Sequence, residues 1–324
     1  MQFAYTGSRG LLSRGIQYDT SRPMNIHELP TDPIERIHNP SREQLRELID
    51  SKRKPLIISG IFEDFGFLKN WNLDYFSTFT EKVPVQKPES DGVNYFVKYF
   101  RIPMSEFAQR LKNGENMYIG AREILTGGGK RSDKDGLGYL KDSMKLPSWF
   151  NQERIYSSNL WAGAGNNKTL LHFDPWDGLM VVAAGEKKFV MFPAEETPKM
   201  AMVSPYDLKK LSTGAVLHSK IKPLTVQPEY QEKFRQARGF SGTMKAGEAI
   251  FIPAGWWHYV ESTGVNIGLN FFLHFSDKKL HMVEPLRSYW VMDNITLWPI
   301  RWWQGFRKHA GNFYHLFVPR KTAA

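Results

Sequence analysis

The chain has 324 residues, enough for one large domain or two ordinary ones, and its 41% hydrophobic and 23% charged residues are typical of a globular protein. With 43 lysines and arginines against 33 acidic residues, the net charge of +10 favours acidic partners without choosing among them. Because the chain has no cysteine, disulfide scaffolds, zinc ribbons, iron–sulfur clusters and thiol nucleophiles are excluded, and histidines and carboxylates must hold any metal.

The sequence contains no apolar run that approaches the roughly 20 residues of a transmembrane helix. The longest such run near the middle of the chain spans residues 179–184. The N-terminus also lacks the apolar core of a secretory signal. We therefore expect no transmembrane segment and a cytoplasmic location.

Short helices and strands are predicted in the first part of the chain. Residues 1–32, rich in glycine, serine and proline, are expected to form an N-terminal arm. Ser41 followed by Gln44 is typical of a capping box, which predicts a helix that continues through Lys52. Further strands are expected at residues 55–60 and 93–100, and further helices from residue 72 and over residues 103–111.

Residues 125–138 (LTGGGKRSDKDGLG) form a polar, glycine-rich insertion. The GGGK within it resembles part of a phosphate-binding loop, but the full spacing of that motif is missing. We interpret the insertion as a mobile surface loop. It could also act as a lid over a site, since long loops often carry function.

From Tyr156 to Phe275 the pattern changes to short apolar runs separated by glycine or proline. Examples are KTLLHFD, LMVVAAG, KKFVMFP, EAIFIPAG and VNIGLNFF. Several strands of this length at regular spacing predict a barrel or a sandwich. After Phe275 the pattern becomes helical again. We therefore expect a mainly β fold with some α, in which one β-barrel carries helical additions at both ends.

Two of the nine histidines lie in strand-like segments. His172 stands in TLLHFD, and because alternate residues of a strand project from the same face, its imidazole and the Asp174 carboxylate point together. His258 stands in a second such segment, AIFIPAGWWHYVES. If the two strands are neighbours in one barrel, the three side chains cover one face of an octahedral metal. From these residues alone, a hydrogen-bonded structural pair remains an alternative for His172 and Asp174.

Lys187 shares its strand face with Phe189 and Met191 in GEKKFVMFP. An inward-facing lysine requires an anionic partner, because an unpaired buried charge is costly. In a barrel that holds a metal, such a cation would pair with the far end of a metal-bound dicarboxylate. The alternative is that Lys187 and Lys188 both decorate a strand end in solvent.

These motifs together carry a resemblance to a known family. The segments LWAGAGNNKTLLHFDPWDGLMVVAAGEKKFVMFPAEE, GEAIFIPAGWWHYVES and GLNFF resemble the Jumonji-C, cupin-like iron(II)/2-oxoglutarate oxygenases. Within this family, the segments most resemble the branch that contains the asparaginyl hydroxylase of hypoxia-inducible factor and the tRNA wybutosine hydroxylase. The resemblance is strong over residues 161–272. It implies a double-stranded β-helix (jelly-roll, cupin) in a catalytic domain at 33–276, with its barrel core at about 156–275 and a C-terminal helical extension at 277–324.

The resemblance also implies roles for individual residues. The positions of the family's iron ligands, which are also its catalytic residues, are occupied by His172, Asp174 and His258. The residues that match contacts of 2-oxoglutarate are Lys187, Thr169 and Tyr118, and Asn270 matches a polar residue that lines the iron site. From the residues alone, Tyr118 could instead be a half-buried strand aromatic, and Asn270 could make a structural hydrogen bond.

One position departs from the family pattern. Many relatives have an asparagine six residues after the first histidine, where this chain has Gly178, so one cosubstrate contact is absent or supplied elsewhere. Asp174 is retained, which favours hydroxylation over halogenation. The resemblance therefore implies hydroxylation of an unactivated C–H bond with Fe(II), 2-oxoglutarate and O₂.

The tail at residues 278–324 is basic, with eight lysines and arginines against two acidic residues. Its aromatic side chains recur at helical spacing: Trp298, Trp302, Phe306, Phe313 and Phe317. We expect this stripe to pack on its own barrel or on a second subunit, giving a homodimer through the C-terminal helices. Membrane-surface docking and nucleic-acid contact are the less favoured alternatives.

The substrate is not specified by any motif. We favour an amino-acid side chain in a protein or peptide. A small-molecule, natural-product or tRNA-base hydroxylase of the same chemistry is the alternative, and a non-catalytic metal-binding cupin module is the alternative from another class. Only the last interpretation predicts that His172→Ala and Lys187→Ala leave function intact.

Overall fold

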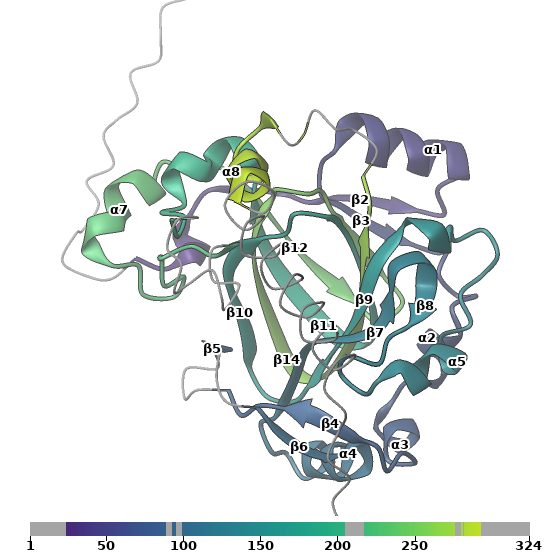
Figure 1. The fold of residues 1–324 in the computed structure, drawn as a ribbon. Helices are drawn as coiled ribbons and strands as arrows, with labels where there is room; N and C mark the ends of the chain where they lie inside the picture. Colours follow the sequence, from purple (N-terminus) through teal and green to yellow (C-terminus); the bar gives the residue numbers. More distant parts are fainter. Residues whose placement is uncertain are drawn as a thin grey trace, which may run out of the picture.

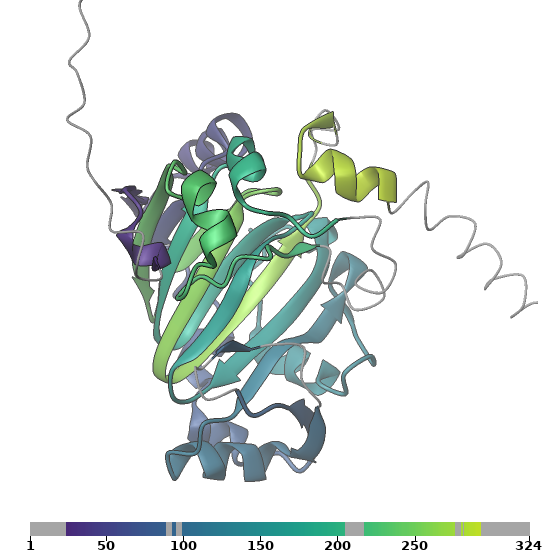
Figure 2. The same ribbon diagram turned by 90° about the vertical axis from the view of Figure 1, so that its left-hand side faces the viewer.

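The computed structural model describes residues 24–88, 93–94, 99–204, 217–275, 280 and 282–292. Long strands form its centre, and helices lie near both ends of them, with α4 at one end and α7 and α8 at the other (Figure 1). The view turned by 90° shows the same long strands lying side by side (Figure 2).

The regular elements follow one another with short connections. The strands are β1 (Thr31–Pro33), β2 (Glu35–His38), β3 (Leu56–Ser59), β4 (Lys82–Val85), β5 (Val93–Asn94), β6 (Phe100–Pro103), β7 (Tyr118–Thr126), β8 (Lys130–Arg131), β9 (Ile155–Gly163), β10 (Asn167–Phe173), β11 (Asp177–Phe192), β12 (Gly239–Lys245), β13 (Ala249–Ile252) and β14 (Trp257–Leu273). The α-helices are α1 (Arg42–Glu47), α2 (Gly66–Asn70), α3 (Leu73–Phe76), α4 (Met104–Lys112), α5 (Lys141–Met144), α7 (Pro228–Phe234) and α8 (Leu286–Val291). The 3₁₀ and π turns are η1 (Ile26–Glu28), η2 (Leu48–Lys52), η3 (Gly127–Gly129), η4 (Gly138–Leu140), η5 (Gln152–Arg154) and η6 (Ala194–Lys199).

One sheet of 12 strands among the described residues builds the barrel, in the order β2-β3-β13-β11-β14-β9-β7-β8, with β12, β1, β10 and β5 attached to its sides. The long antiparallel pair of β11 and β14 runs through both halves of this sheet. The register of that pair shifts beside Gly185, whose φ is +78° and whose Cα faces the Val265 carbonyl so closely that a Cβ would lie 2.4 Å from it. Only glycine fits there, and this bulge lets the two strands bend into a barrel.

Apolar side chains fill both faces of the sheet. The largest cluster lies between the barrel and the helices of the first half, and includes Phe65, Phe107 and Phe271, none of which is exposed. A second cluster joins η1 and α7 to the barrel, for example through Phe234. A third, containing Val182, covers the remaining strand faces. The predicted fold class is confirmed: the protein is mainly β, with helices added to a cupin-like jelly roll.

The predicted elements of the first half are largely present. Ser41 caps α1 in a capping box with Gln44, and the helix continues as the π turn η2 to Lys52. The strand at β3 and the helix at α4 are also where the pattern predicts them. Part of the strand expected at residues 93–100 lies outside the described residues.

The end of the expected N-terminal arm takes part in the fold. Met24 and Ile26 are buried, and β1 pairs with β12 in parallel. The domain boundaries at residues 33 and 276 stay predictions, as does the homodimer through the C-terminal helices. The aromatic stripe of the tail lies outside the described residues.

The segment at residues 125–138, expected to be a mobile surface loop, contains regular elements and buried anchors, and its mobility stays a prediction. This segment contains η3 and β8, and β8 pairs back on β7. Leu125 and Leu137 are fully buried in the large cluster, and the Asp135 carboxylate accepts a hydrogen bond from the Glu123 amide at 2.8 Å. The glycines form the turns of this segment, and Leu125 and Leu137 anchor it in the hydrophobic core.

No helix within the described ranges combines the length and apolar character that crossing a membrane requires.

Candidate metal and cosubstrate site

All seven predicted site residues line a single cavity of about 330 Å³. They come from four strands of the same sheet and one connection: Tyr118 (β7), Thr169 and His172 (β10), Asp174 (after β10), Lys187 (β11), and His258 and Asn270 (β14). We call the group of His172, Asp174 and His258 the metal end of this cavity. The group of Lys187, Thr169 and Tyr118 is its lysine end. No residue of 125–138 lines the cavity, so the lid interpretation has no support in the structure.

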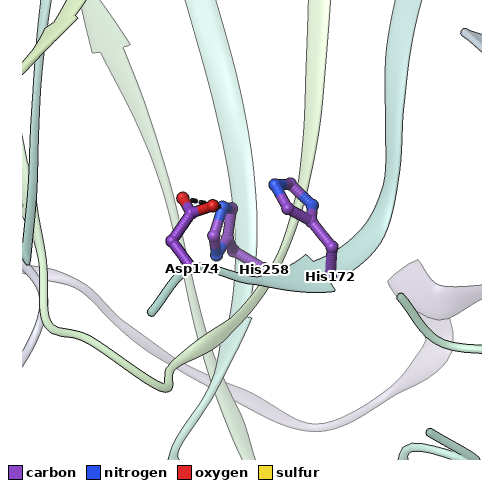
Figure 3. Close-up of side chains that lie close together, drawn as sticks. All are labelled: His172, Asp174 and His258. Atoms are coloured by element: carbon purple, nitrogen blue, oxygen red, sulfur yellow. Dashed lines mark ion pairs between the residues drawn. The ribbon is translucent and has the colours of Figure 1, made fainter. Parts of the chain in front are cut away.

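The metal end is assembled by strand register. His172 and His258 are direct partners in the antiparallel pair of β10 and β14, so the two predicted strands are neighbours. Their ring centroids lie 4.1 Å apart, and Asp174 Oδ2 lies 3.5 Å from His258 Nε2. One donor atom from each residue lies within 4.8 Å of the other two, and the three side chains point toward one another (Figure 3).

Both histidines have their ring orientation fixed by the backbone. His172 Nδ1 lies 2.7 Å from the Leu170 carbonyl, and His258 Nδ1 lies 3.0 Å from the Trp256 carbonyl. A carbonyl oxygen only accepts, so each Nδ1 must carry the proton. This leaves each Nε2 with its lone pair available, which is the arrangement found in metal-binding histidines.

Burial favours the uncharged forms at this end. Burial, with the neighbouring His172, lowers the pKa of His258 well below its ordinary value. Burial likewise raises the pKa of Asp174, although His172 opposes that rise. A divalent cation between the three groups would accept the two neutral nitrogens and stabilise the carboxylate. The donor set therefore fits iron(II), although other divalent ions share this preference.

At the lysine end, Lys187 points inward and is only 2% exposed, whereas Lys188 beside it is exposed. The predicted inward orientation is confirmed, and the strand-end alternative is wrong for Lys187. Its amine has no hydrogen-bond or ion-pair partner among the described residues, and burial lowers the pKa of Lys187 to about 7. Gly268 makes room for its stem, because a Cβ there would lie 3.2 Å from Lys187 Cε.

Two hydroxyl groups line the cavity together with this amine. Tyr118 is 3% exposed, and burial raises the pKa of Tyr118, while a hydrogen bond with Thr169 partly opposes that rise. An ammonium group and two hydroxyls offer only donors or adaptable groups to a ligand. This composition suits a carboxylate, so the lysine end fits one end of a dicarboxylate cosubstrate.

Asn270 on β14 and Gly178 on β11 lie close together, two positions apart in the register of the strand pair. Asn270 is 4% exposed, and its Oδ1 is buried without a hydrogen-bond partner among the described residues. A Cβ on Gly178 would lie 3.6 Å from that oxygen. The side chain that the family pattern predicts at position 178 is thus absent next to the Asn270 amide. For its Oδ1, the alternative of a structural hydrogen bond has no support.

Several residues that line the cavity were not predicted. His218 stacks on His172 with ring centroids 5.3 Å apart and planes 19° apart, and it forms an isolated bridge with the same residue. Trp176 stacks on Tyr156 at 4.2 Å. The short apolar pattern around His218 gave no strand signal, whereas the position of Trp176 two residues after Asp174 could have identified it.

The sequence of this chain is similar to a known family of domains. The model of the cupin-like domain family matches residues 40–279. The chain belongs to this family. The cupin-like domain of this chain is of the Jumonji-C type, so the resemblance to iron(II)/2-oxoglutarate oxygenases is confirmed at the level of the family.

The proteins that are similar to this chain are named for different functions. Human tRNA wybutosine-synthesizing protein 5 is 27% identical over 256 residues, which cover 74% of this chain and 77% of that protein. Lysine-specific demethylase 8 of Xenopus tropicalis is 24% identical over 259 residues, covering 74% of this chain and 52% of that protein. Lysine-specific demethylase JMJ31 of Arabidopsis thaliana is 26% identical over 162 residues, covering 50% and 29%. The family supports iron- and 2-oxoglutarate-dependent oxygenase chemistry, while the named substrates differ.

Proposed function

We propose that the protein is an iron(II)- and 2-oxoglutarate-dependent dioxygenase that hydroxylates an unactivated C–H bond in an amino-acid side chain of a protein or peptide. The observation that carries the proposal is the buried Lys187 amine, which lacks a partner among the described residues and lines the same cavity as His172, Asp174 and His258. A metal ion alone does not account for this lysine. A metal-bound dicarboxylate accounts for both ends of the cavity.

The spacing along the strands supports this pairing. On β14, His258 lies opposite Met191, and Ser262 lies opposite Lys187. Four residues of strand correspond to about 13 Å between the two backbone positions. Because the side chains of His258 and Lys187 line the same cavity, a five-carbon dicarboxylate bound there would have the metal ligands at one end and the amine at the other.

Each group at the site would have a separate task. His172, Asp174 and His258 would hold the metal, and Lys187, Thr169 and Tyr118 would bind the distal carboxylate of 2-oxoglutarate. When bound, iron(II) supplies the oxidative chemistry together with 2-oxoglutarate and O₂. The apolar part of the remaining lining, which includes Phe189 and Ile252, would exclude water and hold the C–H group of the substrate beside the metal end.

A tRNA-base hydroxylase is the second candidate, and one comparison favours it. The human relative that covers 74% of this chain is named for tRNA wybutosine synthesis, and this chain has a net charge of +10. An RNA substrate would be retained with a steep dependence on salt, because each phosphate contact releases counterions. A peptide or small molecule would show a shallow dependence.

The test is an anaerobic titration of the metal-free protein with iron(II) and 2-oxoglutarate, followed by visible absorption. We expect a charge-transfer band that requires both additions and is lost in His258→Ala. Lys187→Ala should raise the concentration of 2-oxoglutarate that is needed to form the band. Lys188→Ala, which changes the exposed neighbour, should behave like the wild type. Absence of the band in folded wild-type protein would refute the oxygenase assignment and favour a non-catalytic cupin module.

If the band forms, turnover identifies the substrate class. Peptides, small metabolites and RNA would be supplied in turn, and succinate formation would be compared with hydroxylated product. Product from peptides supports the proposal. Product from RNA alone would replace it by the second candidate.

A further inference from the structure

Asp177 is a buried carboxylate that lies outside the metal end but touches the segments that carry its ligands. It begins β11, three residues after Asp174, and its side chain is 1% exposed. It binds Arg53, which follows the π turn η2 in the first part of the chain: Arg53 Nη2 lies 2.5 Å from Asp177 Oδ1, and Nη1 lies 3.3 Å from Oδ2. Such a two-point contact fixes both the position and the plane of the carboxylate.

The same carboxylate holds the turn that leads to His258. The Ala254 amide donates to Asp177 Oδ1 at 2.9 Å. The next amide, that of Gly255, donates to the Asp174 carbonyl at 2.9 Å. Two consecutive amides of the turn between β13 and β14 are therefore bound to the connection between β10 and β11. One of them is bound to the residue that supplies the carboxylate of the metal end.

This arrangement joins the two segments that carry Asp174 and His258. The two residues come from different connections, and strand register fixes only the pair of His172 and His258. The side chain of Asp174 lies beyond the end of β10, so its placement depends on the connection that follows. The hydrogen bonds from Ala254 and Gly255 are contacts between that connection and the turn before His258.

We propose that Asp177, held by Arg53, is a positioning residue that sets the distance between the Asp174 carboxylate and the His258 imidazole for metal binding. This inference rests on the proposed function, because it takes Asp174 and His258 as metal ligands. Groups that orient metal ligands through hydrogen bonds commonly change metal affinity by about 10- to 100-fold when removed. Such groups usually bind the side chain of the ligand itself, whereas Asp177 binds a backbone amide in the turn before His258.

The experiment measures binding of cobalt(II) alone to the full metal-free chain, by the visible d–d absorption band. All variants are measured at a temperature below their own unfolding midpoints. Asp177→Ala and Arg53→Ala are expected to lower cobalt affinity by about 10- to 100-fold and to change the shape of the band. Asp177→Asn, which keeps an oxygen acceptor for Ala254, should lose less affinity than Asp177→Ala, and Arg53→Lys should lie between Arg53→Ala and the wild type.

Arg36→Ala is the matched control. Arg36 pairs with Glu248 on the same barrel and donates to the Thr243 carbonyl, but this pair touches neither connection of the metal end. It should leave both cobalt affinity and the band unchanged. If Arg53→Ala or Asp177→Ala does not fold, Arg53→Lys and Asp177→Asn carry the test, with the same intermediate values expected.

The outcomes separate this inference from the proposed function. If wild type binds cobalt, His172→Ala does not, and the folded Arg53 and Asp177 variants bind like wild type, the positioning role is overturned while the metal site stands. If wild type binds no cobalt, the proposed function fails and this inference fails with it. Graded losses in the order described, with Arg36→Ala unchanged, support the inference.

Discussion

The two ends of the cavity are prepared for their ligands in opposite ways. At the metal end, each imidazole already donates to a backbone carbonyl, so the side chains are held in place by the protein itself. At the lysine end, the Lys187 amine is buried without a partner among the described residues. The two imidazoles are preorganised, whereas the lysine amine carries an unfavourable desolvation that a ligand can relieve.

Because of this difference, we expect mutations at the two ends to affect stability and ligand affinity differently. Removing a preorganised ligand destroys binding and relieves little strain, because neutral histidines are inexpensive to bury once hydrogen-bonded. Replacing a buried charge that lacks a partner destroys binding but also removes a penalty from the ligand-free protein. Stability and ligand affinity should therefore move in opposite directions at the lysine end.

The largest expected effect is that of Lys187→Met. This change keeps an unbranched stem that is one atom shorter and removes the charge, so 2-oxoglutarate affinity should fall by about 100-fold, the usual scale for losing one partner of a buried charge pair. The free energy of unfolding of the ligand-free protein should rise by about 1–3 kcal/mol. Calorimetric titration measures the first quantity, and denaturant unfolding measures the second.

The control for this change is Lys188→Met on the exposed face of the same strand. It should alter neither cosubstrate affinity nor stability beyond a few tenths of a kcal/mol. A loss of stability in Lys187→Met would contradict the proposed difference between the two ends of the cavity. It would mean that the amine already has a stabilising partner in the ligand-free protein.

A smaller effect is expected from pH. Burial lowers the pKa of Lys187 to about 7, so above pH 7 the amine must take up a proton before it pairs with a carboxylate. The affinity for 2-oxoglutarate should fall by up to about tenfold per pH unit above 7, and stay level below it. Titrations in two buffers of different ionisation enthalpy should show proton uptake that approaches one at pH 8.5.

The sign for stability is opposite to that for binding. Between pH 7 and the ordinary lysine pKa of about 10.5, the unfolded chain binds a proton that the folded, ligand-free chain has lost. The contribution of Lys187 to the free energy of unfolding therefore rises with pH over this window. Lys187→Arg, which stays charged, should remove both dependences, and their persistence in that variant would assign them to another group.

The metal end could be predicted from the sequence because its signals are local. His172 and Asp174 are two residues apart in a strand pattern, and the alternation around Lys187 put that lysine on the same strand face as Phe189 and Met191. The register that joins His172 to His258 is a long-range property, and the family resemblance supplied it. Local periodicity and the family resemblance together predicted seven residues that line this cavity.

Other features had no local signal. Arg53 and Asp177 are 124 residues apart, so their contact depends on how the π turn packs on the barrel. His218 reaches the cavity from a segment without strand periodicity. In residues 125–138, glycines and charges dominated the pattern, while the burial of Leu125 and Leu137 decided the structure. Tertiary packing overrides composition in each of these cases.

The smallest expected effect is that of Gly178→Asn, which introduces the side chain that the family pattern predicts at this position. The site has room, because a Cβ on Gly178 would lie 3.4 Å from Ile252 Cβ and 3.6 Å from Asn270 Oδ1. The introduced amide can donate to that oxygen, which has no partner among the described residues, or to the cosubstrate. One added hydrogen bond corresponds to a two- to fivefold gain in 2-oxoglutarate affinity, on the order of 1 kcal/mol at most.

Gly178→Ala separates the two contributions, because it fills the same space without a donor. An affinity gain in Gly178→Asn alone would mean that the region beside Asn270 is an incompletely satisfied part of the cosubstrate site, closer in character to the lysine end than to the metal end. Equal losses in both variants would mean that the cosubstrate or the substrate already occupies this space. In that case the missing side chain enlarges the cavity, and Asn270 makes its contact directly with the bound molecule.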